Sequence, residues 1–216
     1  VGATLLANSQ RLFGLTIAKS DFAVFELAEN PVTADYDVYF AGWDATGDRP
    51  NGVTGIHHPR GDVKKIAIDE DMAVATEYLS SRGAPTHWHV SEWEEGVTEP
   101  GSSGSPIFDN VNKRMIGHLS GGFAACNGAV NNNSPDWYGQ TAYAWNANGA
   151  TDPRRRLRDW LDPENIGQLI LDGYAPGDDG LDIDGGSCND PFVVLCNGSY
   201  RGNNGTGQNT FEEYSS

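Results

Sequence analysis

A glycine-rich turn with a serine at its centre, residues 98–106, constrains the fold of this chain more than any other stretch. It reads Thr-Glu-Pro-Gly-Ser-Ser-Gly-Ser-Pro and leads into an apolar pair at 107–108, where we expect a strand. Gly101 and Gly104 bracket Ser103 at offsets where the backbone must bend sharply and approach another group closely. Such a turn can hold a serine hydroxyl out of a sheet, with the N–H groups of Gly101 and Ser103 aimed at one oxygen. The alternative is an ordinary Ser/Gly-rich surface turn.

The composition indicates one domain of ordinary size, alone or with a tail. The chain has 216 residues, of which 38% are hydrophobic, and its 27 glycines and 11 prolines favour short strands over a helical bundle. No apolar run is long enough for a membrane span. The net charge of −16 argues against a nucleic-acid partner, because phosphates would be repelled. The sequence opens on Val1 without a Met or a basic region, so we expect it to begin inside a longer protein.

The apolar patterns predict an antiparallel β protein with one helix. Strands are expected at 1–8, 11–18, 22–27, 38–43, 65–68, 86–93, 107–108, 114–122 and 136–145. The helix is expected at 152–161, because Asp152 can cap it and Pro153 suits its first turn. Its apolar face would contain Leu157, Trp160 and Leu161.

The domain organisation is expected to follow the changes in composition. Residues 1–174 form the main domain, 175–187 an acidic Gly/Asp linker, and 188–216 the start of a Gly/Asn-rich β module. Cys188 and Cys196 are spaced to close a small disulfide loop in an exported protein. Cys126 is left over, either as a buried free thiol or paired with a residue outside the given sequence.

Two histidine pairs are candidate metal ligands. His57 and His58 are adjacent, so in a strand they point to opposite faces and cannot share one ion. A buried, hydrogen-bonded core histidine is the better interpretation of that pair. His87 and His89 share a face, but the pattern offers no third ligand. The sequence therefore predicts neither a metal site nor a cofactor.

The turn around Ser103 resembles the Gly-Asp-Ser-Gly-Gly-Pro nucleophile loop of trypsin-like serine peptidases. Residues 96–108 resemble the lysyl endopeptidase group more closely, as do Ser-Asp-Phe at 20–22, Ile-His-His-Pro at 56–59 and residues 157–163. The resemblance covers roughly residues 2–174. It implies a chymotrypsin-like double β-barrel with an incomplete first barrel and a closing C-terminal helix, in a secreted or extracellular bacterial protein.

The same resemblance implies catalytic roles. Ser103 would be the nucleophile, Asp21 the acid that holds the base, and the N–H groups of Gly101 and Ser103 the oxyanion hole. In this family the histidine base precedes the aspartate, yet no histidine precedes Asp21. We therefore expect the base, and the partner of Cys126, in a preceding segment of the same protein. On spacing alone, Asp21 could be a turn acid that opens a strand.

The specificity pocket is a separate question. The position six residues before the nucleophile, where trypsin has its acid, is Val97 here. The lysyl endopeptidase group has an acid on the opposite wall, which corresponds to Asp136, or else Asp136 is only a turn acid. The facing wall would be Ser120, Gly121 and Gly122. A carboxylate at the bottom of a pocket would prefer an ammonium or guanidinium, although Ser120 replaces a family histidine and weakens strict lysine selectivity.

The function implied is a serine endopeptidase that cleaves protein or peptide substrates after Lys, with Arg left open, through an acyl-enzyme. Two alternatives come from other classes. One is a catalytically inactive peptidase-like protein that binds basic peptide segments, and the other is a surface module. A histidine in a small-x-His-Cys context upstream of Val1 would favour the enzyme.

Overall fold

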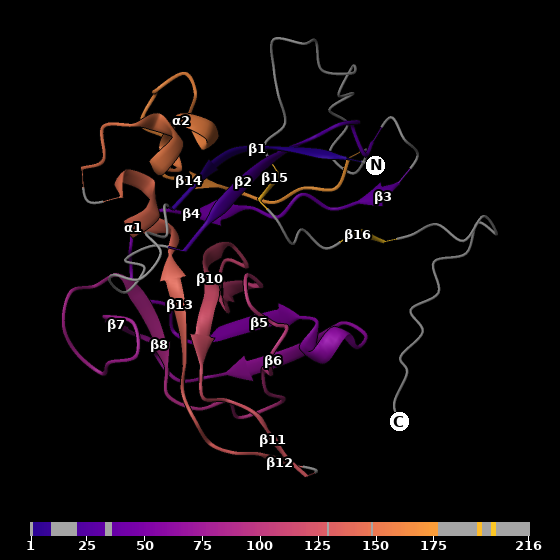
Figure 1. Ribbon diagram of the computed structural model, residues 1–216, viewed down its shortest axis with the longest axis vertical. Coiled ribbons are helices and arrows are strands. Elements are labelled where there is room, and N and C mark those ends of the chain that lie inside the picture. The colour runs from indigo at the N-terminus through magenta and orange to yellow at the C-terminus, as the bar shows by residue number, and fades with distance from the viewer. Residues whose placement is uncertain are drawn as a thin grey trace.

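In the computed structural model the regular secondary structure is mainly β-strand with few helices, as expected for the chymotrypsin-like all-β fold (Figure 1). It describes residues 2–9, 21–32, 36–128, 130–147, 149–176, 194–195 and 200–201. The expected strand at 11–18, the Cys188–Cys196 loop and most of the linker and β module lie outside these residues. No helix in the described ranges has the length and apolarity needed to cross a membrane.

A small antiparallel sheet represents the first barrel. It contains β1 (Ala3–Asn8), β2 (Ala23–Leu27) and β15 (Val194–Leu195), with β2 in the middle. The register of β1 on β2 shifts between Leu5 and Ala7. A separate two-stranded pair joins β3 (Asp37–Val38) to β16 (Tyr200–Arg201). The strands expected at 1–8 and 22–27 are confirmed, whereas the one expected at 38–43 is interrupted.

A nine-stranded sheet forms the larger half of the molecule, drawn below the first sheet in Figure 1. Its main path runs β6-β5-β9-β10-β13-β8-β7, and every neighbouring pair on it is antiparallel. The bounds are β5 Val53–His57, β6 Lys65–Asp69, β7 Val74–Thr76, β8 His87–Val90, β9 Pro106–Asp109, β10 Met115–Gly122 and β13 Asp136–Gln140. β4 (Trp43–Asp44) and β14 (Ile170–Leu171) pair beside β10, and β11 (Cys126–Asn127) with β12 (Val130–Asn131) forms a hairpin.

Two apolar clusters hold these sheets. The first lies within the large sheet and contains Trp88, Trp93 and Tyr138, each at most 2% exposed. The second joins the two sheets, because it combines Val24 of the small sheet with Met115 of β10 and with Trp43, Trp145 and Leu157. Of the residues predicted from the sequence, Asp21 and the loop around Ser103 contact β10 near this junction, whereas Asp136 begins β13.

The helical segments differ from the sequence-based expectation. The strand expected at 136–145 ends at Gln140, and α1 (Thr141–Asn146) follows. Thr141, Ala144 and Trp145 are its buried residues, a spacing of three and four that a helix, not a strand, places on one face. The strong β pattern before residue 140 extended the predicted strand too far.

The expected helix at 152–161 is broken into two pieces. Asp152 caps the first as predicted, accepting a hydrogen bond from the Arg154 N–H at 3.0 Å, but only a 3-10 turn follows (η2, Pro153–Arg155). Arg156 is extended, and the Leu157 N–H donates to the Ala144 carbonyl instead of to its own helix. The closing helix is therefore a single α-turn, α2 (Arg158–Leu161).

Candidate active site

The loop around Ser103 connects residues near β8 to β9 in a conformation that depends on two glycines. Gly101 has φ of 102° and Gly104 has φ of 82°, the left-handed region that glycine adopts without steric cost. Inside the loop, Ser102 N–H donates to the Glu99 carbonyl at 2.9 Å and Ser105 N–H donates to the Ser102 carbonyl at 3.0 Å. These bonds fold the loop tightly, while the Ser103 side chain stays exposed.

Two backbone donors at the centre of this loop have no acceptor among the described residues. Gly104 N–H donates to the Leu119 carbonyl at 2.8 Å, and the neighbours Ser102 and Ser105 also have partners. Among the described residues, by contrast, neither Gly101 N–H nor Ser103 N–H has a hydrogen-bond acceptor. These are the two donors that the sequence predicts for an oxyanion hole.

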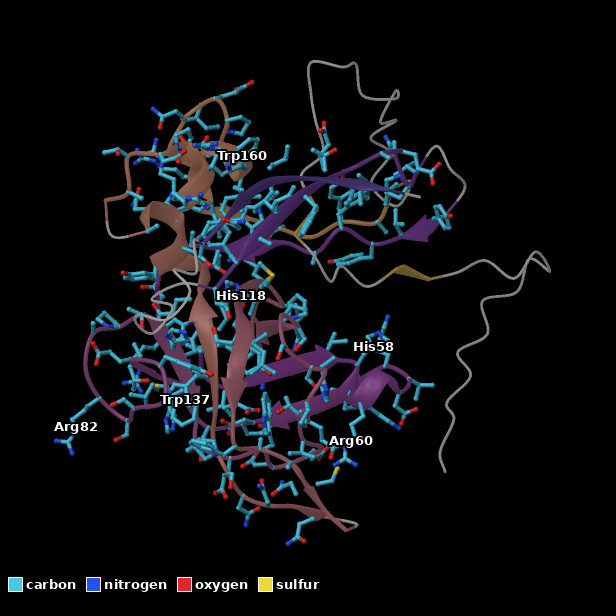
Figure 2. All side chains as sticks on the ribbon, in the orientation of Figure 1. His58, Arg60, Arg82, His118, Trp137 and Trp160 are labelled. Carbon is cyan, nitrogen blue, oxygen red and sulfur yellow. The ribbon has the colours of Figure 1, made fainter. Side chains whose placement is uncertain are left out.

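Asp21 and the nucleophile loop contact neighbouring residues of β10. Asp21 precedes β2 and lies beside His118, whose imidazole has a hydrogen bond to the Asp21 backbone. The next residue, Leu119, exchanges two backbone bonds with the loop, one with Gly104 and one with Ser105. Figure 2 shows His118 where β10 meets the small sheet. β10 thus brings the predicted acid and the predicted nucleophile loop together.

The histidine at this junction is held neutral. Burial lowers the pKa of His118 to about 4, while the nearby Asp21 carboxylate and the hydrogen bond to the Asp21 backbone act in the opposite direction. Its Nε2 atom is buried without a partner in the described structure. His118 is a residue that sequence reasoning missed, because nothing in the pattern of β10 indicates which element packs across it.

None of the five histidines of the chain hydrogen-bonds Ser103 within the described residues. His57 pairs with Ser102, and His118 with the Asp21 backbone. His87 bonds Thr86 and Ser120, His58 bonds the Asp62 carbonyl, and the His89 ring packs at a tilt against Trp137. The described structure therefore contains the predicted nucleophile and acid but no base in contact with Ser103.

The Asp136 carboxylate is enclosed at the start of β13. It is 1% exposed, and its Oδ2 accepts hydrogen bonds from Trp93 Nε1 at 2.8 Å and from Thr98 Oγ1 at 2.5 Å. Burial raises the pKa of Asp136, whereas the bonds from Thr98, Trp93 and the Ala124 backbone lower it. The carboxylate is thus oriented by the very residues that flank the nucleophile loop.

The three wall residues lie opposite Asp136, at the end of β10. Gly121 pairs with Trp137 and Gly122 with Asp136 across the two strands. Gly122 is required for close approach, because a Cβ there would lie 2.1 Å from Asp136 Oδ1. The missing side chain of Gly122 therefore makes room for the Asp136 carboxylate itself. Ser120 Oγ lies 3.2 Å from His87 Nε2.

Comparison with known proteins decides the family. The family model described as "Lysyl endopeptidase, C-terminal domain" matches residues 2–139, which include Asp21, Ser103 and Asp136. This chain belongs to the lysyl endopeptidase family. A curated lysyl endopeptidase from Pseudomonas aeruginosa is 35% identical over 126 residues, which is 56% of this chain and 25% of that protein. The chain therefore spans about a quarter of the length of this relative, and a peptidase-related function is supported.

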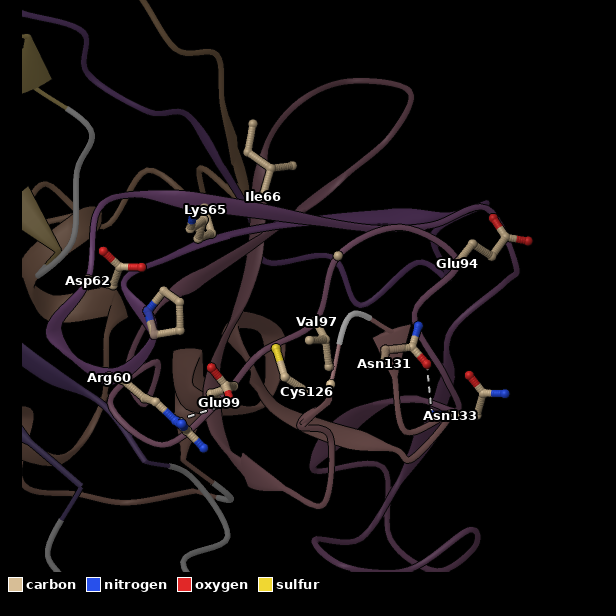
Figure 3. Close-up of a pocket in the computed structure, with 13 residues that line it drawn as sticks. Arg60, Asp62, Lys65, Ile66, Glu94, Val97, Glu99, Cys126, Asn131 and Asn133 are labelled. Carbon is tan, nitrogen blue, oxygen red and sulfur yellow. Dashed lines mark hydrogen bonds and ion pairs between the residues drawn. The ribbon is translucent and has the colours of Figure 1, made fainter. Parts of the chain in front are cut away.

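Beside the loop of this lysyl endopeptidase homologue lies a cavity of about 770 Å³ (Figure 3). Arg60, Glu99 and Cys126 are among its lining residues, and Asp136 is not. Glu99 forms an ion pair with Arg60, 3.2 Å between Oε1 and Nε. Of the two alternatives for Cys126, the buried free thiol is wrong, because the thiol is exposed; a partner outside the sequence stays a prediction. Burial and a hydrogen bond to Glu99 raise the pKa of the thiol, while Arg60 and Lys65 lower it.

A group of three carboxylates, from Asp69, Asp71 and Glu94, also lies within the large sheet region. Their oxygens approach one another within 4.8 Å. Burial raises the pKa of Asp69 to about 6, and its carboxylate already accepts the Asp71 N–H at 2.9 Å. Such a cluster of acids is compatible with a cation, but no other feature of the described residues indicates one.

Cys126 gives a prediction that does not depend on catalysis. At pH 8 its thiol should react with an aromatic disulfide reagent more slowly than an unfolded cysteine, because the thiolate reacts and the pKa is raised. Glu99→Gln should increase the rate several-fold, whereas Glu94→Gln, in the same cavity, should not. Mass spectrometry of the peptide that contains Cys126 gives the rate. Equal rates for wild type and Glu99→Gln would show that the carboxylate has no influence.

Proposed function

We propose that this chain is the catalytic part of a serine endopeptidase that cleaves after Lys, with Arg left open. The observation that carries the proposal is the loop at 98–105, in which the Ser103 hydroxyl is exposed next to two N–H groups without an acceptor in the described part of the chain. The loop and Asp21 contact adjacent residues of β10, Leu119 and His118, which supports Asp21 as the acid. The family match supports the same chemistry.

The proposed reaction follows from these groups. Ser103 Oγ attacks the scissile carbonyl carbon while a histidine base takes its proton, and the carbonyl oxygen becomes an oxyanion that accepts bonds from Gly101 N–H and Ser103 N–H. Collapse breaks the peptide C–N bond, and the base gives its proton to the leaving amine. Water then hydrolyses the ester on Ser103 by the same route.

The base is proposed to come from a part of the protein outside the given sequence. Each of the five histidines of the chain contacts a residue other than Ser103. The curated relative is about four times as long as the region that matches this chain, so it has sequence in which a base could lie. A secreted protein that acts on other proteins is the setting we propose. If no base is supplied, the same surface would bind basic peptide segments without cleaving them.

A serine-directed fluorophosphonate probe tests the proposal. In the full-length protein Ser103 should be labelled, Ser103→Ala should abolish labelling, and Ser105→Ala, the buried neighbour in the same loop, should retain it. The given chain alone should label only weakly, since a serine hydroxyl without a nearby base is a weak nucleophile. Labelling that persists in Ser103→Ala would place the nucleophile elsewhere, and a full-length protein without labelling would favour the binding alternative.

A further inference from the structure

A buried hydrogen bond links β5 to the residue before the proposed nucleophile. His57, the last residue of β5, is 1% exposed, and its Nδ1 lies 2.9 Å from Ser102 Oγ. Ser102 is also 1% exposed. The two residues are 45 positions apart in the sequence, and their contact joins the loop to a strand that carries no other predicted site residue.

The Ser102 hydroxyl is held from two sides. Ser102 Oγ accepts the Glu99 N–H at 3.2 Å and lies within hydrogen-bond distance of His57 Nδ1. A hydroxyl has one proton and two lone pairs, so it can donate to Nδ1 or accept from Nδ1–H, and either tautomer of His57 forms the bond. Burial lowers the pKa of His57 and His58 lowers it further, while Glu99 acts in the opposite direction. Nε2 itself has no hydrogen-bond partner among the described residues.

The residues after His57 also contact the loop. Arg60 N–H donates to the Pro100 carbonyl at 2.8 Å, and the Arg60 guanidinium pairs with Glu99. Gly101 lies directly on this segment, because a Cβ added to it would come within 3.0 Å of the Arg60 nitrogen. Residues 57–60 therefore hold 99–102 through one side-chain bond, one backbone bond and one ion pair.

We propose that His57 is a positioning residue for the oxyanion hole. The Ser103 N–H belongs to the peptide bond that begins at Ser102, so fixing the Ser102 side chain fixes the plane in which that N–H points. The contact of Arg60 with Pro100 orients the preceding peptide bond, which carries the Gly101 N–H. This inference rests on the proposed function of Ser103, and it adds a residue that directs the donors without touching the substrate.

The alternative is that His57 only fills the core. A core residue would affect stability and all ligands alike, whereas a positioning residue affects ligands that form an oxyanion. The two therefore differ in how they change binding of a peptide aldehyde, which forms a tetrahedral adduct with Ser103, relative to the matched peptide amide, which does not.

The test uses the full-length protein with His57→Ala, His57→Asn and Ser102→Ala. His57→Ala and Ser102→Ala should weaken the aldehyde by about 10²-fold, the effect of losing one oxyanion donor, and leave the amide nearly unchanged. His57→Asn should restore most of the aldehyde affinity, because its amide, like the imidazole, can form a hydrogen bond with Ser102 Oγ. His58→Ala is the control: His58 is exposed and its ring bonds the Asp62 carbonyl, not the loop at 98–106, so its loss should leave both ligands unchanged.

Equal losses of affinity for aldehyde and amide, or a His57→Asn variant that binds the aldehyde as weakly as His57→Ala, would overturn the positioning role.

Nitrogen-15 NMR of labelled histidine provides a readout that needs no activity. The His57 Nδ1 signal of the wild type should show a hydrogen bond that Ser102→Ala removes. A protein that retains this signal but is not labelled by the serine probe would refute the proposed function and reduce the pair to a structural contact. A protein that is labelled but lacks the signal would refute the pair alone.

Discussion

Replacing Asp21 with asparagine should lower kcat of the full-length enzyme by about 10⁴-fold without unfolding it. The acid in such a triad keeps the imidazole in the correct tautomer and stabilises the imidazolium that forms when Ser103 gives up its proton. Asparagine has the same size but no charge, and its amide can favour the wrong tautomer. The structure makes this substitution mild for folding, because Asp21 is only half-buried at the beginning of β2.

Glu26→Gln is the matched control for this prediction. The substitution removes one negative charge, as Asp21→Asn does, but Glu26 lies within β2 and its side chain is exposed. Its kcat should therefore equal that of the wild type, and both variants should keep the wild-type melting temperature within a few degrees. A fall of less than tenfold in Asp21→Asn would mean that Asp21 only opens the strand.

The strands of this protein could be predicted because their apolar residues alternate. β1, β2, β6, β8, β9 and β10 all lie within or overlap the predicted ranges. The helix α1 could not be predicted, because its buried face depends on a contact between Trp145 and Trp43. The two ring centroids are 4.9 Å apart, but the residues are far apart in the sequence. The same holds for residues 152–161, where a hydrogen bond from Leu157 to Ala144 breaks the predicted helix.

In the site, too, features set by neighbouring residues could be predicted, and contacts between residues distant in the sequence could not. The glycines around Ser103 could be recognised because the turn itself requires them, and both have positive φ. One histidine of the pair at 57–58 could be assigned to the core, and the structure shows that it is His57, which is buried and hydrogen-bonded. Its partner Ser102 could not be identified, because the contact depends on how β5 is placed beside the loop.

The hydrogen-bond partners of Asp136 could not be predicted from the sequence either. Its two side-chain donors, Trp93 and Thr98, are 43 and 38 residues away. Together with the Ala124 backbone they satisfy part of the carboxylate and leave it fixed, not free to turn toward solvent. A fixed, desolvated carboxylate discriminates between cationic and neutral partners more strongly than an exposed one.

Asp136→Ala and Asp136→Asn should therefore abolish the preference for lysine. A buried charge pair that loses one partner costs about 2–5 kcal/mol, which corresponds to about 30-fold to 5,000-fold in kcat/KM for a lysine peptide. Hydrolysis of a pre-activated ester that lacks a cationic side chain should change little, because Ser103 and the oxyanion donors are intact. Glu164→Gln, an exposed acid after α2, should leave the lysine preference unchanged.

The preference should also depend on pH in a direction set by burial. Burial raises the pKa of Asp136, so its carboxylate takes up a proton at a higher pH than an exposed aspartate would. Protonation removes the negative charge that the lysine ammonium group needs. On acidification, kcat/KM for lysine peptides should therefore fall at a higher pH than kcat/KM for a neutral ester. Peptides that differ only in the residue before the scissile bond provide the measurement. Equal kcat/KM values for Lys, Leu and Glu peptides in the wild type would refute Asp136 as the residue that determines specificity, while leaving the role of Ser103 to its own test.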